Sequence, residues 1–588
     1  MKIFMHFIKK NYIAIVIFGL LIILRFIWID KFPPGMQYDE VEYSLSSKTF
    51  QMMGTDLSGV GFPKTLVITK TLGKVSPIPY MALSPLWNII NLNIVTYRSL
   101  YVILNVITTF VFMLFLHYLF KKKDITLLGG ILFLLNPWSF FLSRHGMDGS
   151  FALLFYLLGT IFLLKEYSKK NIIASFIFFF LGFFSYHGAK LYLIPFVIIL
   201  SIYKICTQKI HGKKLTPYIL IILSLMLTVC AFVIGGKVIS GSILDTRSSE
   251  FVFTNTNKFS DIVNSIRTAS IQSPFRTIMI NKVIFAIQYF VGNYLETFSP
   301  TLLFLKAEVL EFHGLFYVFE VILLIVGFVA LFDKNRTIFW LITTITATLP
   351  ISTATSLSGF SVLNRAILLL PMLLIYITYG LYSLHTLVIK YVSKKVLILS
   401  FGLLYLGSFI FFQYMYFFIL PIQINMHYQT NTRVLAKYLS IEKKLAPKII
   451  IVASKPQVLF SGIVFYLPRS EQEKILQQRQ ILRNTSTSVF AIDNITITPE
   501  CVTPFNPNYT YLIDHDKELC YKKIPFNDLV INQKDAGIDF SIVGGRTCQE
   551  YKLTRWLDQH LLSDFSIENM SNEQFCKRWI ARPLPSLP

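Results

Sequence analysis

The sequence of 588 residues predicts a polytopic α-helical membrane protein that ends in a small α/β domain. Hydrophobic residues make up 54% of the chain and charged residues only 15%, whereas soluble globular proteins carry about 25% charged residues. Apolar runs long enough to cross a bilayer recur along residues 1–421. After residue 421 charges return, and short β-rich runs alternate with helix-like stretches, which indicates a separate extracytoplasmic domain over residues 422–588.

About eleven apolar runs of roughly 17–25 residues are long enough to be transmembrane helices. They lie near residues 11–29, 97–120, 125–142, 148–165, 171–186, 189–205, 216–236, 313–332, 336–355, 362–386 and 396–421. The first run has no small-residue cleavage site, so we expect an uncleaved signal anchor.

The formal net charge of +23 is first of all a topology signal. With eleven spans, the basic clusters between the runs fall on one side of the membrane. They are Lys9-Lys10, Lys121–Lys123, Lys169-Lys170, Lys213-Lys214, Lys334 with Arg336, and Lys394-Lys395. Positive residues mark the cytoplasmic side. The sequence therefore predicts a plasma-membrane protein with a cytoplasmic N-terminus and an outer C-terminal domain, and no nucleic-acid partner is expected.

The first outer loop, 30–96, is expected to lie against the membrane surface. Residues 77–92 are apolar but short and interrupted by prolines, and counting them as a span would place Lys121–Lys123 outside. We therefore expect residues 39–54 and 77–92 to form two interfacial helices. A second outer segment is expected over 237–312.

The cysteines divide between the two parts of the chain. Cys206 and Cys230 lie in or near spans and are expected to be unpaired apolar residues. The other four, Cys501, Cys520, Cys548 and Cys576, lie in the outer domain, where an even number suggests two disulfides of open connectivity. They show no CxxC spacing, so zinc is not expected there.

Several polar residues on the outer side are not explained by topology. They are Asp39, Glu40, Lys74, Arg98, Arg144, His145, Asp148, Tyr186, His187, Lys190 and Arg365. Ionisable residues at the ends of spans are functional candidates, and outward Arg and Lys suit a phosphate.

Structural roles are open for the same residues. Asp39 could cap the helix that follows it, and Arg98 could reach up to lipid headgroups. Arg144 and Asp148, spaced i,i+4, could form a local ion pair worth about 0.3–0.5 kcal/mol. The rings of His145 and His187 could simply sit at the interface.

The order of several motifs resembles the GT-C glycosyltransferases, in particular the family 39-like branch of protein O-mannosyltransferases (dolichyl-phosphate-mannose-protein mannosyltransferases) and aminoarabinose transferases. The similarity begins with "PPGMQYDEVEYSLSSKTFQMMGTDLSG" and continues through "SPIPYMALSPLW", "TYRSLYVILN", "LNPWSFFLSRHGMDGSFALLF", "SYHGAKLYLIP", "NYLETFSPTLLF" and "LNRAILLLP" across residues 1–390. It implies a GT-C transmembrane domain over 1–421.

The resemblance implies an inverting transfer of a sugar from a polyprenyl-phosphate donor to a glycan, lipid or protein acceptor of the cell envelope. Asp39 would be the catalytic base. Lys74, Arg98, Arg144, Lys190 and Arg365 would stabilise the leaving phosphate. Glu40 and Asp148, with His145, Tyr186 and His187 nearby, would orient donor, acceptor or cations. No cofactor is required by this chemistry, although a divalent metal remains possible.

Two other functions fit many spans and outer cations. A transporter or flippase of a lipid-linked sugar would need charged residues at the bilayer midplane and repeated halves, which the sequence does not show. A sensor that binds its ligand through the outer domain would leave Asp39 and Glu40 without a purpose. Glycosyl transfer therefore remains the first hypothesis.

Overall fold

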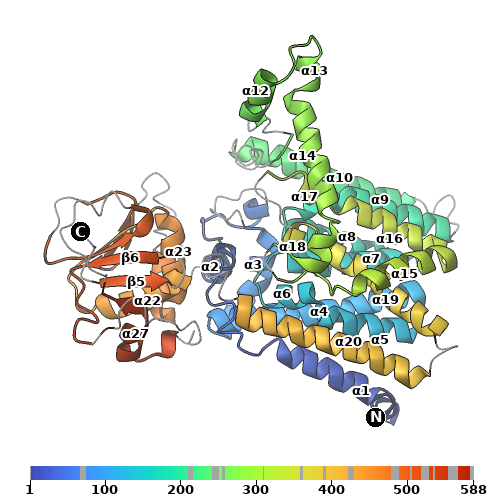
Figure 1. Cartoon of the computed structure of the whole chain (residues 1–588), viewed down its shortest axis with the longest axis horizontal. Helices are drawn as coiled ribbons and strands as arrows, with labels where there is room; N and C mark the ends of the chain where they lie inside the picture. Colours follow the sequence, from blue (N-terminus) through green and yellow to red (C-terminus); the bar gives the residue numbers. More distant parts are fainter. Residues whose placement is uncertain are drawn as a thin grey trace.

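A computed structural model of the chain contains a helical body and a mixed sheet-and-helix unit beside it (Figure 1). The structure describes residues 2–66, 75–208, 216–240, 251–253, 259–308, 310, 312–357, 362–388, 393–420, 430–478, 489–502, 506–517, 529–533, 537–551, 553 and 567–582.

The helical body is built from the elements before residue 421. They are α1 (Lys2–Leu24), α2 (Tyr38–Met53), η1 (Lys64–Leu66), α3 (Pro77–Leu83), η2 (Ser84–Asn88), α4 (Ile94–Phe120), α5 (Lys123–Leu135), α6 (Pro137–Ser143), α7 (Gly149–Leu164), α8 (Lys169–Ser185), α9 (Ala189–Gln208), α10 (Thr216–Ser240), α12 (Ser260–Ala269), α13 (Arg276–Met279), α14 (Lys282–Glu296), η5 (Thr301–Leu305), α15 (Glu320–Lys334), α16 (Arg336–Thr348), α17 (Ile351–Ala354), α18 (Val362–Arg365), α19 (Leu369–Val388), α20 (Lys394–Tyr414) and η6 (Met415–Ile419).

Each of the eleven predicted runs overlaps a helix, but the number of full spans is smaller. Six described helical stretches are long and apolar enough to cross a membrane: Ile94–Phe120, Ala189–Thr207, Arg276–Leu305, Arg336–Ala354, Leu369–Thr386 and Lys395–Ile419. The pair α5 and α6, bent by 63°, gives a seventh if it is counted as one span. Asn136 and Pro137 cause this bend, because proline lacks the N–H that would continue the helix. The predicted count of eleven is not reached by this measure.

One stretch of span length was not predicted as a span. Arg276–Leu305 falls inside the expected outer segment 237–312, and only 6% of its most apolar window is buried. In Figure 1, α12, α13 and α14 project from the helical body, and α14 runs crosswise to α20. Composition therefore marks this stretch as a span, whereas its direction differs from that of the bundle.

Small residues let α15 and α19 pack closely in the body. A Cβ added at Gly327 would collide with the backbone of Tyr376, and one added at Gly380 would collide with the backbone of Leu323. Both clashes involve main-chain atoms, which cannot turn aside as a side chain can. Small residues commonly allow this close backbone approach between membrane helices.

The remaining elements form what we call the tail unit, the described residues between 430 and 582. They are α22 (Thr430–Glu442), β1 (Ile449–Val452), α23 (Pro456–Tyr466), α24 (Arg469–Gln477), β2 (Phe490–Ile492), β3 (Ile495–Thr498), β4 (Thr510–Asp514), η8 (His515–Lys517), β5 (Leu529–Gln533), β6 (Gly537–Val543), η10 (Ile567–Asn569), α27 (Asn572–Trp579) and β7 (Ile580–Ala581).

The sheet of the tail unit is mixed, with the strand order β2-β3-β1-β4-β6-β5-β7. β1 is parallel to both of its neighbours, with Ile449 opposite Ile495 of β3 and Thr510 of β4. The remaining pairs are antiparallel. β1 is buried along its whole length, as expected for a central parallel strand.

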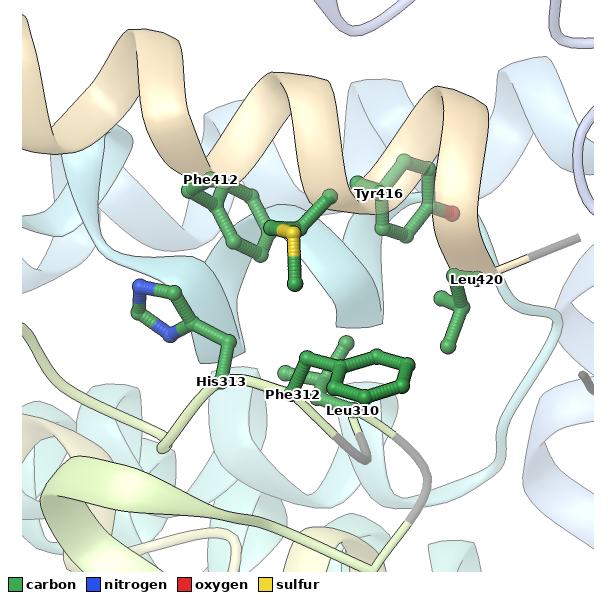
Figure 2. Close-up of a pocket in the computed structure, with 7 residues that line it drawn as sticks. Leu310, Phe312, His313, Phe412, Tyr416 and Leu420 are labelled. Carbon is green, nitrogen blue, oxygen red and sulfur yellow. The ribbon is translucent and has the colours of Figure 1, made fainter.

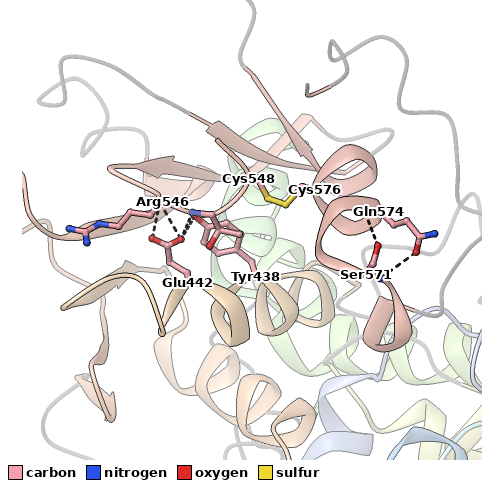
Figure 3. Close-up of a disulfide and its surroundings, with 8 residues drawn as sticks. Tyr438, Glu442, Arg546, Cys548, Ser571, Gln574 and Cys576 are labelled. Carbon is pink, nitrogen blue, oxygen red and sulfur yellow. Dashed lines mark hydrogen bonds between the residues drawn. A yellow bond between two sulfur atoms is a disulfide. The ribbon is translucent and has the colours of Figure 1, made fainter. Parts of the chain in front are cut away.

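A buried carboxylate and a disulfide hold the tail unit together (Figure 3). Glu442 is fully buried, and its oxygens accept hydrogen bonds from Thr510 Oγ1 at 2.7 Å, the Thr547 backbone N–H at 2.7 Å and the Arg546 backbone N–H at 3.0 Å. Cys548 and Cys576 are joined by a disulfide that places α27 beside the loop after β6.

The other cysteines can be compared with the predictions in part. Cys206 and Cys230 are free, as predicted. Cys501 is also disulfide-bonded, whereas Cys520 lies outside the described residues.

The tail unit lies against the segment between α1 and α2 and against α2 itself, at the opposite end of the body from the beginning of α1 (Figure 1). Helices α23 and α24 contact α2. On its other sides α2 packs against α3 and η2 of the body, so that residues 40–49 are all buried. The predicted helices over 39–54 and 77–92 are present, as α2 and as α3 with η2, but α2 is covered by protein and is not laid open along a lipid surface.

Candidate active site at the start of the first outer loop

The adjacent acids Asp39 and Glu40 point to different surroundings. Both lie in the first turn of α2, where successive side chains are about 100° apart around the helix. Asp39 is exposed, and Glu40 is buried with 1% of its surface accessible. Glu40 accepts hydrogen bonds from the backbone N–H of Gln37 at 2.9 Å and of Gly146 at 2.8 Å. Glu40 therefore fixes the helix start, while Asp39 is presented outward.

Arg98 completes the surroundings of Glu40. Its Nη2 lies 3.3 Å from Glu40 Oε2, and the guanidinium also donates to the backbone carbonyls of Pro33 (2.7 Å), Gly35 and Ile29 (3.5 Å). The side chain has no accessible surface. Its position at the start of an apolar run predicted a contact with a phosphate or a lipid headgroup, but the structure directs the Arg98 guanidinium into the protein.

Arg144 has the same kind of surroundings. Its two Nη atoms donate to the carbonyls of Arg25, Ile27, Trp28 and Phe32 at 2.8–3.0 Å, and the side chain is fully buried. These bonds occupy the Nη groups that a phosphate ligand would need. The Nη groups of Arg144 therefore bind backbone carbonyls and do not form the local ion pair with Asp148 that the i,i+4 spacing allowed.

Asp148 is held by a small polar cluster between α2, α3 and α7. Its Oδ2 accepts from the hydroxyl of Tyr43 at 2.6 Å and from Ser76 Oγ at 3.3 Å, and its Oδ1 accepts from the Gly149 N–H at 2.9 Å as the N-cap of α7. The Tyr43 hydroxyl in turn accepts from the backbone N–H of Ser76 at 2.7 Å. Burial and the neighbouring Asp148 raise the pKa of Tyr43 well above its usual range, so this phenol stays protonated.

His145 is buried beside this cluster. Its Nδ1 lies 2.6 Å from the carbonyl oxygen of Phe141, and its ring stacks on the Phe141 ring with centroids 3.7 Å apart. The residue is therefore packed inside the body and does not lie at a lipid interface.

Tyr186, His187 and Lys190 keep part of their surface accessible. They lie at the turn from α8 to α9, and Lys190 Nζ is 3.2 Å from His187 Nδ1. The ammonium also lies 4.0 Å from the centroid of the Phe232 ring, a cation–π contact that holds the cation next to an apolar wall. In contrast to Arg98 and Arg144, Lys190 keeps part of its surface accessible.

Arg365 ends α18 and is also half-buried. Its neighbour Asn364 packs against Gly149, since a Cβ added there would collide with the Asn364 side chain. This contact brings α18 next to the Asp148 end of α7. Across from it, Glu308 accepts a hydrogen bond from the Val362 N–H at 3.2 Å. Burial raises the pKa of Glu308 to about 7, although that hydrogen bond and the positive charge of Arg365 act in the opposite direction.

Lys74 lies outside the described residues. Three further residues near the predicted ones, Tyr43, Glu308 and Asn364, were not predicted from the sequence. Tyr43 follows Asp39 by four residues and so shares its face of α2, a spacing that could have identified it. For Glu308 and Asn364 no comparable signal existed, because each is brought to the site by a contact between distant segments.

A mostly apolar pocket lies between the loop before α15 and the end of α20 with η6 (Figure 2). Figure 2 shows Phe412, Tyr416 and Leu420 on the helical wall facing Leu310, Phe312 and His313 on the loop. The helical wall also packs on Arg144, whose guanidinium lies 5.1 Å from the centroid of the Phe417 ring. The pocket thus adjoins the segment that leads to Asp39.

A metal would need a group of oxygen, nitrogen or sulfur ligands. Among the described residues, no three His, Cys, Asp or Glu side chains are grouped to hold one.

Comparison with known proteins gives similarities of structure only. No protein family and no curated sequence matches the chain. Among solved structures it is similar to ArnT from Cupriavidus metallidurans bound to undecaprenyl phosphate, with a TM-score of 0.49, 10% identity, and coverage of 90% of this chain and 97% of ArnT. The apo state of ArnT gives a TM-score of 0.48 at 11% identity, covering 90% of this chain and 98% of ArnT.

A third similar structure is the oligosaccharyltransferase of Archaeoglobus fulgidus in complex with Zn and sulfate. Its TM-score is 0.44 at 9% identity, and 90% of this chain and 73% of that protein are covered.

Proposed function

We propose that the protein is a membrane glycosyltransferase that moves a sugar from a polyprenyl-phosphate donor to an acceptor at the outer face of the membrane. One observation carries this proposal: an exposed carboxylate, Asp39, starts a helix whose position is fixed by the buried Glu40. Tyr43, four residues further along that helix, donates to Asp148. Gly149, next to Asp148, packs against Asn364, the neighbour of the partly accessible cation Arg365.

The proposed reaction is a single displacement with inversion. Asp39 removes the proton from the acceptor nucleophile as that atom attacks the anomeric carbon. The bond from this carbon to the phosphate oxygen breaks, and its electron pair leaves with the polyprenyl phosphate, which gains one negative charge. Lys190 and Arg365 are the described cations with accessible surface that we assign to stabilising this charge.

The remaining candidates receive other roles in this proposal. Glu40, Arg98 and Arg144 hold the backbone that presents Asp39, while we assign Asp148, Tyr186 and His187 to orienting the donor or the acceptor. Lys74 remains a candidate phosphate ligand from sequence alone. The donor is a substrate, so we propose no cofactor.

The test uses the purified full-length protein in lipid nanodiscs with a panel of radiolabelled polyprenyl-phosphate sugars and a cell-envelope extract as the source of acceptor. Label transferred to acceptor is counted for wild type and for Asp39→Asn. We expect this variant to lose at least about 100-fold in transfer rate, because a positioned base contributes roughly 10²–10⁴-fold.

The matched control is Asp124→Asn. Asp124 is also an exposed aspartate in the first turn of a helix, α5, but it follows the far end of α4. The Asp124→Asn variant should transfer sugar at the wild-type rate. Wild type, Asp39→Asn and Asp124→Asn should all unfold at the same temperature. Wild-type transfer by Asp39→Asn would disprove the base assignment. Movement of the donor across a liposome bilayer without its consumption would support a transporter in place of a transferase.

A further inference from the structure

The segment between α1 and α2, residues 25–35, is irregular and has to satisfy its backbone carbonyls without a helix or a sheet. Three arginines from distant parts of the chain do this. Arg144 binds four of these carbonyls and Arg98 binds three. The third is Arg433 of the tail unit, which donates from Nη1 to the carbonyls of Asp30 at 3.2 Å and Pro34 at 2.6 Å.

The contact of Arg433 is buried and specific. The side chain retains 2% of its accessible surface, and its Nε and Nη2 form a bidentate pair with the two carboxylate oxygens of Glu568, each at 2.7 Å. The planar fork of arginine is well suited to such a pair. Glu568 therefore fixes the plane of the guanidinium, and the remaining nitrogen, Nη1, points at the loop of the helical body.

A second polar contact joins the tail unit to α2 further along. Lys48, with 3% of its side chain accessible, lies 2.8 Å from Glu473 of α24, and Arg469 binds the same carboxylate at 2.8 Å. Arg469 also donates to Asn91 at 2.6 Å. The tail unit therefore holds both the segment just before α2 and the second half of that helix, with Asp39 in between.

We propose that Arg433 is a positioning residue for Asp39, so that the tail unit is a working part of the active site and not an appended domain. Pro34 is five residues before Asp39, and only Gly35, Met36, Gln37 and Tyr38 separate them. When the Pro34 carbonyl is held, the helix start and the direction of Asp39 are held with it. The catalytic part of this inference, that sugar transfer depends on Arg433, rests on the proposed function. The mechanical part, that Arg433 holds the segment before α2 in place, does not.

The test is hydrogen–deuterium exchange on the full-length protein in nanodiscs, together with donor turnover. Arg433→Met keeps the length and apolar stem of the side chain but removes its hydrogen bonds. Glu568, with 45% of its side chain accessible, can then be hydrated, so the unit is expected to fold. Since hydrogen bonds to a charged donor are lost, exchange in peptides covering residues 29–41 should rise by roughly tenfold or more.

Exchange in β1 and β4 should stay at the wild-type rate. The kcat for sugar transfer should fall at least about tenfold with little change in the KM for the donor, because the base is displaced and the donor site is not. Arg433→Lys should restore part of the protection, since an ammonium can still donate to one carbonyl but cannot form the fork with Glu568. Lys577→Met removes an exposed ion pair elsewhere in the tail unit and should change neither readout.

Each other outcome overturns a stated part of the inference. Unchanged exchange over residues 29–41 would show that Arg433 does not hold the loop. A rise that is equally large in β1 and β4 would show that Arg433 only stabilises the tail unit. A local rise with unchanged kcat would show that the loop is held but that Asp39 does not depend on it. If wild type transfers no sugar at all, the proposed function fails, and the exchange result still decides the mechanical part.

Discussion

Arg98 and Glu40 form an ion pair of 3.3 Å in which both side chains are buried, 0% and 1% accessible. Two charges removed from water in this way need further partners, and they have them in the N–H groups of Gln37 and Gly146 and the carbonyls of residues 29–35. The pair therefore joins α2, α4 and the loop before α7 at one point. Asp39, next in sequence to Glu40, is carried on this support.

Replacing one partner of this pair is expected to destabilise the protein strongly. Glu40→Ala leaves the Arg98 guanidinium buried without its counter-charge and two backbone N–H groups without acceptors, so we expect a loss of about 3–5 kcal/mol in the free energy of unfolding. Thermal unfolding in detergent measures it. Glu296→Ala, an exposed glutamate in the last turn of α14, is the control and should change stability by less than about 0.5 kcal/mol. Equal unfolding temperatures for the two variants would contradict the buried network.

The close approach of α15 and α19 can be tested by comparing the effect of Gly→Ala on stability at a packed and at an open position. Gly327→Ala places a methyl group against the backbone of Tyr376, which cannot move aside without separating the helices. We expect a destabilisation of about 1–3 kcal/mol. Gly402→Ala, in α20, meets nothing within 4 Å and should be neutral or slightly stabilising, because alanine is the better helix former. Comparable unfolding temperatures for both variants would show that the two helices do not pack this closely.

The tail unit should resist alkylation at its bonded cysteines. In denatured protein that has not been reduced, a thiol reagent should label Cys206 and Cys230 but leave Cys501, Cys548 and Cys576 unlabelled. Peptide mass spectrometry before and after reduction measures this. Cys548→Ser should lower stability by about 2–4 kcal/mol, since the disulfide closes a loop of 28 residues. Labelling of Cys548 without reduction would contradict the bond, and Cys206→Ser should leave stability unchanged.

Some elements of the fold could be predicted from the sequence and others could not. The helices at the eleven apolar runs were predictable because hydropathy is a property of each local stretch. The crosswise course of α14 was not, since a stretch of span length and composition does not reveal its direction. The burial of α2 under the tail unit also escaped prediction, because it depends on contacts such as Lys48 with Glu473, more than 400 residues apart in the chain.

The candidate site shows the same division. Sequence located the outer polar residues, and the i,i+4 spacing of Asp39 and Tyr43 places them on one face of α2. It could not distinguish a cation that keeps accessible surface from one that is fully buried against backbone carbonyls. Arg144 and Lys190 both lie at the ends of apolar runs, yet Arg144 donates to four backbone carbonyls while Lys190 keeps accessible surface. That difference arises because the backbone of residues 25–35 is irregular, so its carbonyls need side-chain donors. No local sequence pattern predicts this irregular course.

The raised pKa of Glu308 predicts a pH dependence of stability. Because burial raises this pKa to about 7 from 4.5, the folded protein binds more protons than the unfolded chain between these two values. The stability contributed by the neutral form is therefore fully present below about pH 4.5 and is lost as the pH rises through about 7. Glu308→Gln should remove this dependence, so the stability difference between pH 5.5 and pH 8, measured by thermal unfolding, should be smaller than in wild type. An identical pH profile for both proteins would contradict the burial of this carboxyl.

Tyr43 provides the most specific test of the polar cluster that Asp148, Tyr43 and Ser76 form. Tyr43→Phe removes only the hydroxyl that donates to Asp148 and accepts from the Ser76 N–H, so a buried backbone donor and a buried carboxylate each lose a partner. We expect a loss of about 1–3 kcal/mol in stability and, because we propose that Asp148 orients the donor or the acceptor, a lower kcat in the transfer assay. Tyr12→Phe, at an exposed position in α1, is the matched control and should change neither. A Tyr43→Phe protein with wild-type stability would show that the hydroxyl does not bridge these groups. Lost stability with an unchanged kcat would instead confine Tyr43 and Asp148 to the fold and remove Asp148 from the proposed site.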